Sequence, residues 1–201
     1  MNIAVFVSGN GTNLQALIDA QSGGELATGR IVLVVCDSPE AYALVRAGEA
    51  GINTFLLRPG GFASREEYDK EIVRKLREEK IELVVLAGFM RILSAYFIEE
   101  YENRILNVHP ALLPSFKGTH GIRDAFEFGV KVTGVTVHFV NKELDAGVII
   151  LQSCVRVEED DTMNTLEEKI HAVEHKLYPE AVRLFVQGKL RIEGRKVKIL
   201  E

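Results

Sequence analysis

The chain has 201 residues, 47% of them hydrophobic and 26% charged. This ordinary globular composition excludes a disordered or fibrous protein, and the length allows a sizeable core in one domain spanning residues 1–201. A formal net charge of -5 excludes the broad basic surface with which proteins bind nucleic acid or anionic lipid.

No segment of the sequence is expected to cross a membrane. The longest apolar runs, Ile31 to Cys36 and Leu83 to Ala87, are far shorter than the roughly 20 residues that span a bilayer. Met1 leads straight into a strand-like run without the features of a signal peptide. Cys36 and Cys154 show no spacing typical of disulfides or zinc sites, so we expect both to be packing residues of a cytoplasmic protein.

Runs of Val, Ile and Leu alternate with segments of helical period through the first half of the chain. Buried strands are predicted at 3–7, 31–36, 52–57, 83–87 and 104–108. Helices are predicted at 14–20, 41–50 and 66–80. This order is typical of an α/β fold with a doubly wound, mainly parallel sheet and helices on both of its faces.

The pattern changes after Lys131. Two β-rich runs, 132–140 and 148–157, predict an antiparallel hairpin, and the residues between them, 141–147, form its loop. The hairpin therefore extends the parallel sheet in the C-terminal half of the chain.

The last forty residues predict a long helix and a second, smaller hairpin. Asp161 and Thr162 are candidate N-caps for a helix that runs toward Gln187. Residues 188–200 predict two short strands around the turn at Glu193 and Gly194.

A glycine-rich turn, Ser8 to Asn13, follows the first strand and opens the first helix. Backbone N–H groups and the helix dipole at such a turn can receive an anion. Leu14 stands where the dinucleotide fingerprint needs a third glycine, and no GxxxxGK[ST] motif occurs, so a small phosphorylated ligand is favoured over NAD or ATP. The alternative is a tight turn that needs glycine for its dihedral angles and binds nothing.

Asn107 and His109 stand two residues apart on one predicted strand, and therefore on one face of it. Because Pro110 cannot extend the strand, His109 should lie at the carboxyl end, where open α/β sheets bind ligands. Histidine can act as a general acid or base, an amide can donate to an oxyanion, and a carboxylate such as Asp145 could hold the charged ring. Taken singly, His109 can also be an ordinary strand-end histidine, and Asp145 a turn former.

A second pattern, His171, Glu174 and His175, matches the H-x-x-E-H motif of inverted zinc peptidases. Both histidines would lie on one helical face. Zinc needs a third protein ligand, and no later motif supplies one, so this zinc hydrolase is kept only as a minor alternative and no metal is expected.

Five segments of the chain together resemble the phosphoribosylglycinamide formyltransferases, a folate-dependent family, over nearly the whole length. They are Ser8 to Leu14, Leu86 to Leu93, Leu106 to Pro110, Leu112 to Pro114 and Thr136 to Val140. The resemblance implies transfer of a formyl group from 10-formyltetrahydrofolate, a co-substrate, to the amine of glycinamide ribonucleotide in purine synthesis. It also implies that Asn107, His109 and Asp145 are the catalytic residues.

The same resemblance implies two binding regions. The residues expected around the ribonucleotide are Gly11, Thr12 and Asn13 at the phosphate, with His171, Ala172, Val173 and Glu174 toward the ribose or glycinamide. The residues expected around the folate are Arg65, Met90, Arg91, Ile92, Leu93, Asn107, Asn141, Lys142, Glu143, Leu144 and Asp145. Core packing is the alternative for Met90, Ile92 and Leu93, and a solvated helix start is the alternative for Arg65.

The implied mechanism is direct attack of the amine on the formyl carbon, without a covalent enzyme intermediate. Asn107 and protonated His109 would stabilise the oxyanion, and His109, with Asp145, would help to move the amine proton to the folate nitrogen. Two residues depart from the family pattern: Lys117 and Val148 each replace a proline. We expect these changes to affect the loops over the folate pocket rather than the chemistry.

Two related activities remain as alternatives. Formyltetrahydrofolate deformylase transfers the formyl group to water, and methionyl-tRNA formyltransferase transfers it to a charged tRNA. The first is expected to carry an additional regulatory domain and the second a basic C-terminal domain, and neither is predicted in this sequence. The expected partners are therefore small molecules, and the chain is expected to be a monomer or a homodimer.

Overall fold

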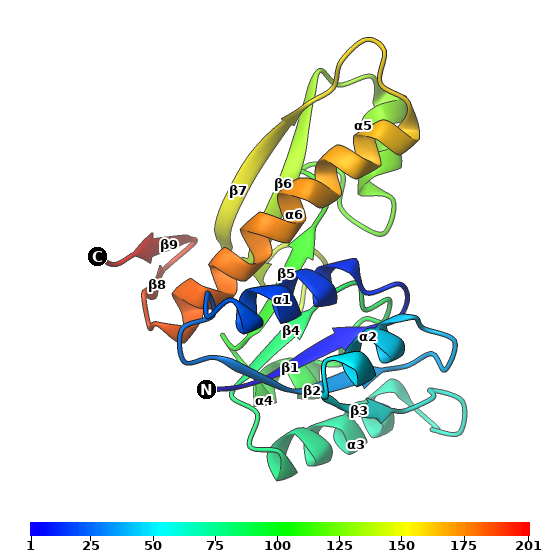
Figure 1. Cartoon of the computed structure of the whole chain (residues 1–201), viewed down its shortest axis with the longest axis vertical. Coiled ribbons are helices and arrows are strands. Elements are labelled where there is room, and N and C mark those ends of the chain that lie inside the picture. The colour runs from blue at the N-terminus through cyan, green and yellow to red at the C-terminus, as the bar shows by residue number, and fades with distance from the viewer.

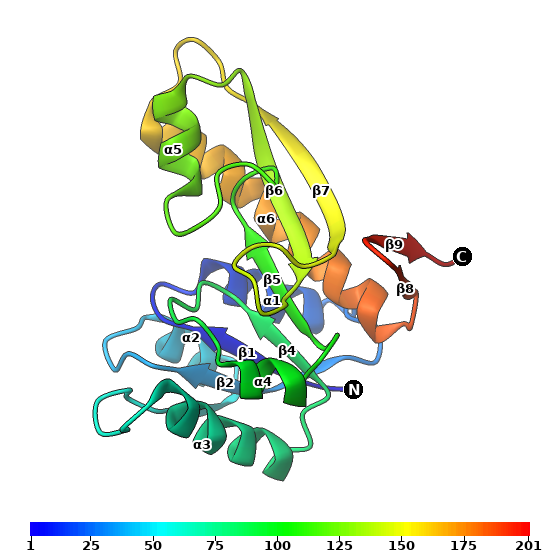
Figure 2. The ribbon, with the colours of Figure 1, turned by 180° about the vertical axis from the view of Figure 1, so that it is seen from behind.

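The computed structural model describes residues 1–201 as a seven-stranded sheet with helices on both faces, and a separate two-stranded hairpin (Figures 1 and 2). The strands of the large sheet are β1 Asn2–Val7, β2 Arg30–Cys36, β3 Asn53–Leu56, β4 Leu83–Leu86, β5 Ile105–His109, β6 Val132–Phe139 and β7 Ile149–Arg156. The terminal hairpin consists of β8 Leu190–Glu193 and β9 Lys196–Ile199. The helices are α1 Thr12–Ser22, α2 Ala43–Glu49, α3 Arg65–Glu78, α4 Ala95–Glu100, α5 Gly121–Phe128 and α6 Met163–Val186.

The large sheet is doubly wound, as the alternation of elements predicts. Its strand order is β3-β2-β1-β4-β5-β6-β7, with parallel pairing from β3 through β5 and antiparallel pairing of β6 and β7. The order of the parallel strands reverses between β1 and β4. Ligands of doubly wound sheets bind outside the carboxyl ends of the strands at such a reversal.

Two hydrophobic clusters cover the two faces of the sheet. The larger cluster lies under α1, α2 and α6, and the smaller one lies under α3 and α4. Figure 1 shows α1 and α6 in front of the sheet, and Figure 2 shows α3 and α4 on the opposite side. The hydroxyl of Tyr178 on α6 donates to the carbonyl oxygens of Leu86 and Leu106, at 2.9 and 3.0 Å, and so fixes the long helix over β4 and β5.

The long helix begins where the sequence predicts. The Thr162 hydroxyl accepts from the N–H of Thr165, and the Thr165 side chain accepts from the N–H of Thr162, which completes a capping box. No helix of the chain has both the length and the apolar character needed to cross a membrane.

Two expectations about individual elements are wrong, and two short helices have no counterpart among the expected elements. The run at 52–57 is not a buried strand, because β3 lies at the edge of the sheet, pairs only with β2 and exposes most of its side chains. Cys154 is exposed on the other edge strand, β7, and is not a packing residue, whereas Cys36 is buried. The short helices α4 and α5 were not predicted, because six and eight residues are too few to show a clear period.

Gly147 closes the loop between β6 and β7, and we expect Gly147→Ala to destabilise the fold by about 3 kcal/mol or more. An added Cβ would lie 1.6 Å from the carbonyl oxygen of Phe139, so the backbone itself must move. Urea unfolding measures the change. The matched control is Gly48→Ala on α2, where an added Cβ meets nothing within 4 Å and a gain of about 0.5–1 kcal/mol is expected. Equal stability of Gly147→Ala and the wild type would contradict this packing.

Candidate active site

The turn after β1 and the loop after β4 meet at the point where the strand order reverses. The two strands are parallel neighbours, so both segments leave the same edge of the sheet. The N–H of Met90 donates to Oγ of Ser8 at 2.9 Å and joins the two segments directly. His109 is the last residue of β5, the next strand, as its position before Pro110 predicts. The turn expected at the phosphate, the loop expected at the folate and His109 therefore lie at one edge of the sheet.

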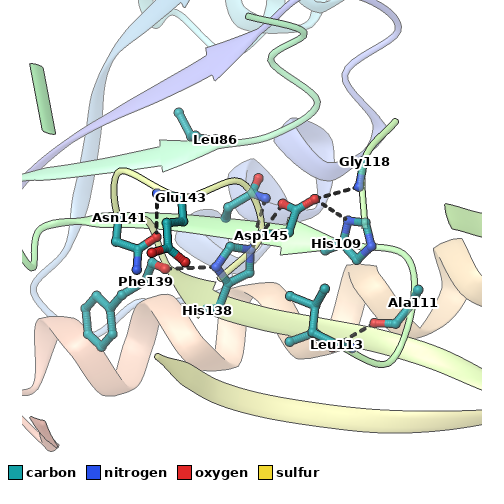
Figure 3. A network of polar contacts seen from close by, with 12 residues as sticks. Leu86, His109, Ala111, Leu113, Gly118, His138, Phe139, Asn141, Glu143 and Asp145 are labelled. Atoms are coloured by element: carbon teal, nitrogen blue, oxygen red, sulfur yellow. Dashed lines mark hydrogen bonds and ion pairs between the residues drawn. The ribbon is translucent and has the colours of Figure 1, made fainter. Parts of the chain in front are cut away.

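Four polar side chains form a continuous row at this edge, and Figure 3 labels three of them, His109, His138 and Asp145. Asn107 Nδ2 lies 3.2 Å from His138 Nε2, and His138 Nε2 lies 3.8 Å from Asp145 Oδ1. Asp145 Oδ2 lies 3.6 Å from His109 Nδ1. The three residues expected to carry the chemistry are thus brought together, but Asn107 reaches Asp145 only through His138.

Asp145 holds His109 from one side, and a loop carbonyl holds it from the other. His109 is only 3% exposed, and its Nε2 lies 2.8 Å from the carbonyl oxygen of Phe116. Asp145 itself accepts from the N–H of Gly118 at 2.8 Å, and its backbone has a positive φ of 47°. Both ring nitrogens of His109 therefore face acceptor oxygens.

His138, which we did not predict as a site residue, sets the direction of the Asn107 amide. Its Nδ1 lies 2.8 Å from the carbonyl oxygen of Phe139, which can only accept, so Nδ1 carries the proton. Burial lowers the pKa of His138, although Phe139 and Asp145 act in the opposite direction. The neutral ring therefore accepts from one N–H of Asn107 through Nε2, and the second N–H remains available to a ligand.

We expect the buried His138 to make stability depend on pH. Because its pKa in the folded protein lies below the value of 6.5 that it has when exposed, the unfolded chain takes up the proton first as the pH falls. The wild type should therefore lose more stability between about pH 7.5 and about pH 5.5 than His138→Gln does. Urea unfolding at both pH values measures this difference. His120→Gln, which removes an exposed histidine, is the control, and parallel slopes for wild type and His138→Gln would contradict the assignment.

Residues expected around the ribonucleotide come together between α1 and α6. Asn13 Nδ2 donates to Glu174 Oε2 at 2.9 Å, and His171 Nδ1 lies 2.9 Å from the same oxygen. The hydrogen bond with Glu174 raises the pKa of His171. Gly11 and Thr12 lie beside this cluster at the start of α1, which has no side-chain cap.

The carboxylate of the motif from His171 to His175 belongs to this cluster. Glu174 is 3% exposed and accepts a hydrogen bond from Asn13. The two histidine rings stack with centroids 6.2 Å apart, and no group of three potential metal-binding side chains forms around them. Within the same stretch of α6, Ala172 is exposed and Val173 packs against the core.

The residues expected around the folate differ in exposure. Met90, Ile92 and Leu144 are 66%, 58% and 56% exposed, which makes them available to a ligand, whereas Leu93 packs in the smaller core cluster. The two arginines expected around the folate differ in their contacts. Arg65 is the exposed first residue of α3, whereas the guanidinium carbon of Arg91 lies 5.0 Å from the centre of the Tyr68 ring. The exposed loop residues are Asn141, Lys142 and Glu143.

Asp69 is a second residue of the site region that the sequence analysis missed. It is 2% exposed on α3, and its Oδ2 accepts from the N–H of Ser94 at 2.6 Å. Burial raises the pKa of this carboxyl. The signal was a carboxylate on the apolar face of a predicted helix, between Tyr68 and Ile72. Its contact anchors the end of the loop that carries Met90 and Ile92.

The two departures from the expected family pattern lie next to residues that contact the polar row. Lys117 stands between Phe116 and Gly118, the residues that contact His109 and Asp145. The carbonyl oxygen of Val148 accepts from the N–H of Phe139 at 2.9 Å. A proline at position 148 would keep that carbonyl, so the substitution leaves this contact of the hairpin intact.

Comparison with known proteins gives a consistent set of relatives. A family model described as formyl transferase matches residues 1–182. The phosphoribosylglycinamide formyltransferase of Escherichia coli is 43% identical over 192 residues, which cover 96% of this chain and 90% of that protein. The protein of the same description from Bacillus subtilis is 38% identical over 180 residues, covering 90% of this chain and 92% of its own.

Longer proteins also match. The trifunctional purine biosynthetic protein adenosine-3 of Drosophila melanogaster is 43% identical over 92% of this chain, and the chain spans only 14% of its length. Among solved structures, glycinamide ribonucleotide transformylase 1 from Symbiobacterium toebii is 46% identical, with a TM-score of 0.97 over 100% of this chain and 94% of that one.

Proposed function

The chain belongs to the formyl transferase family, and we propose that it transfers a formyl group from 10-formyltetrahydrofolate to the amine of glycinamide ribonucleotide. This reaction is a step of de novo purine biosynthesis. The proposal takes the acceptor from the relatives that span the same length as this chain, and the donor from the family.

The observation that carries the proposal is the position of the polar row. Asn107, His138, Asp145 and His109 lie at the edge of the sheet that the turn after β1 and the loop after β4 also share. The turn leads to the uncapped helix start at Gly11 and to the polar cluster of Asn13 and Glu174, which suit a phosphorylated, hydroxyl-rich ligand. The loop carries exposed apolar residues, which suit a flat aromatic ligand.

In the proposed reaction the amine nitrogen forms a bond to the formyl carbon, and the bond from that carbon to the folate nitrogen breaks. Attack places negative charge on the formyl oxygen, which the free N–H of Asn107 and the cationic ring of His109 stabilise. As that bond breaks, the charged His109 gives its proton to the folate nitrogen, and the ring, now neutral, takes up the proton that the amine loses. Since Asp145 faces Nδ1, the reacting nitrogen of His109 is Nε2, which exchanges the carbonyl of Phe116 for substrate.

Hydrolysis of the formylfolate is the alternative use of the same groups. A hydrolase needs only the apolar surface, His109 and water. The cluster of Asn13, His171 and Glu174 then has no purpose as a ligand site, which is why transfer to a ribonucleotide is favoured.

One assay separates these functions. Protein purified without added metal is mixed with 10-formyltetrahydrofolate, and loss of the formylfolate is followed by absorbance with and without glycinamide ribonucleotide. Loss that requires the ribonucleotide, and that a chelator does not change, is the expected result. Loss without the ribonucleotide would identify a hydrolase, and loss of activity with the chelator would favour the zinc alternative.

A further inference from the structure

Arg46, on α2, lies directly against the glycine-rich turn. Its Nε donates to the carbonyl oxygen of Asn10 at 2.9 Å, and its Nη2 donates to Oδ1 of the same residue at 2.8 Å. Its Nη1 donates to Oε1 of Gln15 on α1 at 3.2 Å, and the guanidinium carbon lies 4.9 Å from the centre of the Tyr42 ring. All three hydrogen-bond acceptors are neutral oxygens. Arg46 therefore binds the turn through hydrogen bonds, and these acceptors do not neutralise its positive charge.

The turn and α2 pack so closely that they form one unit. Gly11 has a positive φ of 77°, and an added Cβ there would lie 2.7 Å from Cβ of Ala43. The N–H of Ala43 also donates to the carbonyl oxygen of Gly9 at 3.1 Å. The two hydrogen bonds from Arg46 to Asn10 complete this contact, so the backbone from Gly9 to Gly11 is held on the α2 side along its whole length.

This arrangement determines what the turn presents on its other side. With the carbonyl oxygens of Gly9 and Asn10 drawn toward α2, negative ends of peptide dipoles are turned away from the start of α1. Gly11 is the N-cap of α1 and no side chain caps the helix, so the first N–H groups of α1 are available to an anion. Arg46 adds a full positive charge next to the turn and the first turn of α1.

Two other cations provide a comparison. Lys176 and Arg183 lie with Arg46 and Thr12 around a cavity of about 700 Å³ between α1 and α6. Arg183 donates only to Gln187, on its own helix, and neither cation makes a hydrogen bond to the turn. Of these three basic residues, only Arg46 makes hydrogen bonds to the turn.

We propose that Arg46 is a positioning residue for the phosphate end of the ribonucleotide: it orients the turn from Gly9 to Gly11 and supplies the positive potential that selects a phosphorylated acceptor. The inference rests on the proposed function. It assigns Arg46 to acceptor affinity and not to the chemical step, because its partners do not include any member of the polar row.

Steady-state kinetics of three kinds of variant test the proposal. Arg46→Gln, which loses the charge, should raise KM for glycinamide ribonucleotide about tenfold, with kcat and KM for the folate within about twofold of the wild type. Arg46→Lys, which keeps the charge but loses the two-pronged contact with Asn10, should raise KM about threefold. Lys176→Gln and Arg183→Gln should leave KM unchanged. An unchanged KM in Arg46→Gln, or an equal rise in the two control variants, would overturn the proposal.

Salt dependence supplies a readout that a purely structural role would not alter. Raising the ionic strength from about 0.05 M to about 0.5 M should raise KM of the wild type more steeply than KM of Arg46→Gln, because the variant has lost the screened charge. Thermal unfolding shows whether Arg46→Gln is folded. Parallel salt dependence of wild type and variant would reduce Arg46 to a packing residue and contradict the assignment.

Direct binding of ribose 5-phosphate keeps this test separate from that of the proposed function. If the wild type does not consume glycinamide ribonucleotide, the proposed function fails, but calorimetry with ribose 5-phosphate still tests Arg46. The wild type should bind it about tenfold more tightly than Arg46→Gln does, and should bind ribose without phosphate far more weakly. Equal binding to wild type and Arg46→Gln, or no binding to either, would refute the role of Arg46 whatever the reaction.

Discussion

Replacing His109 with alanine is expected to lower kcat by about 10²- to 10⁴-fold, the range that a positioned general acid or base contributes. The ring is buried, with Asp145 at 3.6 Å from Nδ1 and the Phe116 carbonyl at 2.8 Å from Nε2, so alanine at this position removes the proton-transferring group and its two contacts. Single-turnover measurement of formyl transfer separates this loss from effects on product release. His120→Ala, which removes an exposed histidine from the start of α5, should keep near-normal turnover.

Asp145→Asn tests whether the carboxylate acts through His109. The single variant should be slower than the wild type, because asparagine leaves the imidazolium without its anionic partner. The double variant His109→Ala, Asp145→Asn should be no slower than His109→Ala alone, since both changes remove one function. Near-normal single-turnover rates in His109→Ala and Asp145→Asn would remove both residues from the mechanism, and losses that multiply would give Asp145 a separate role.

Replacing Asn107 with alanine is expected to lower kcat by about 10²- to 10³-fold, the usual cost of one oxyanion donor. His138 Nε2 accepts from one N–H of this amide, so the other N–H has a fixed direction and does not need to reorganise during attack. Because the interaction forms in the transition state, KM for both substrates should change little.

Two further variants serve as controls for Asn107→Ala. Asn53→Ala, on the exposed edge strand β3, should have no effect on kcat. His138→Gln should lower kcat by less than Asn107→Ala, because the amide remains but its direction is less restricted. A large rise in KM with unchanged kcat in Asn107→Ala would assign Asn107 to ground-state binding and contradict the oxyanion role.

Much of the fold followed from the sequence because its signals are local. Strand and helix periods depend on neighbours within a few residues, so the doubly wound order, the hairpin of β6 and β7 and the capped start of α6 were predicted with shifts of one or two residues. Exposure was predicted less well. The apolar residues of β3 and the small side chain of Cys154 on β7 suggested burial. Both are exposed because β3 and β7 lie at the edges of the sheet, and which strand lies at an edge depends on how the whole sheet pairs.

Part of the candidate site also followed from local sequence signals. Asn107 and His109 share one face of β5 because of the two-residue period of a strand, and Pro110 marks the strand end, so the sequence by itself placed them at the carboxyl end of this strand. Their roles, and those of the residues expected around both substrates, remain predictions for the experiments above.

Only the tertiary structure decided which distant groups join them. The antiparallel register puts His138 opposite Asn107, and the loop that follows β6 brings Asp145 back to His109. Glu174 meets Asn13 only because α6 packs across α1. Pairing and packing are set by the burial of whole faces and not by local pattern, so separation along the chain carries no information about these contacts. The polar row therefore became visible only in the folded chain.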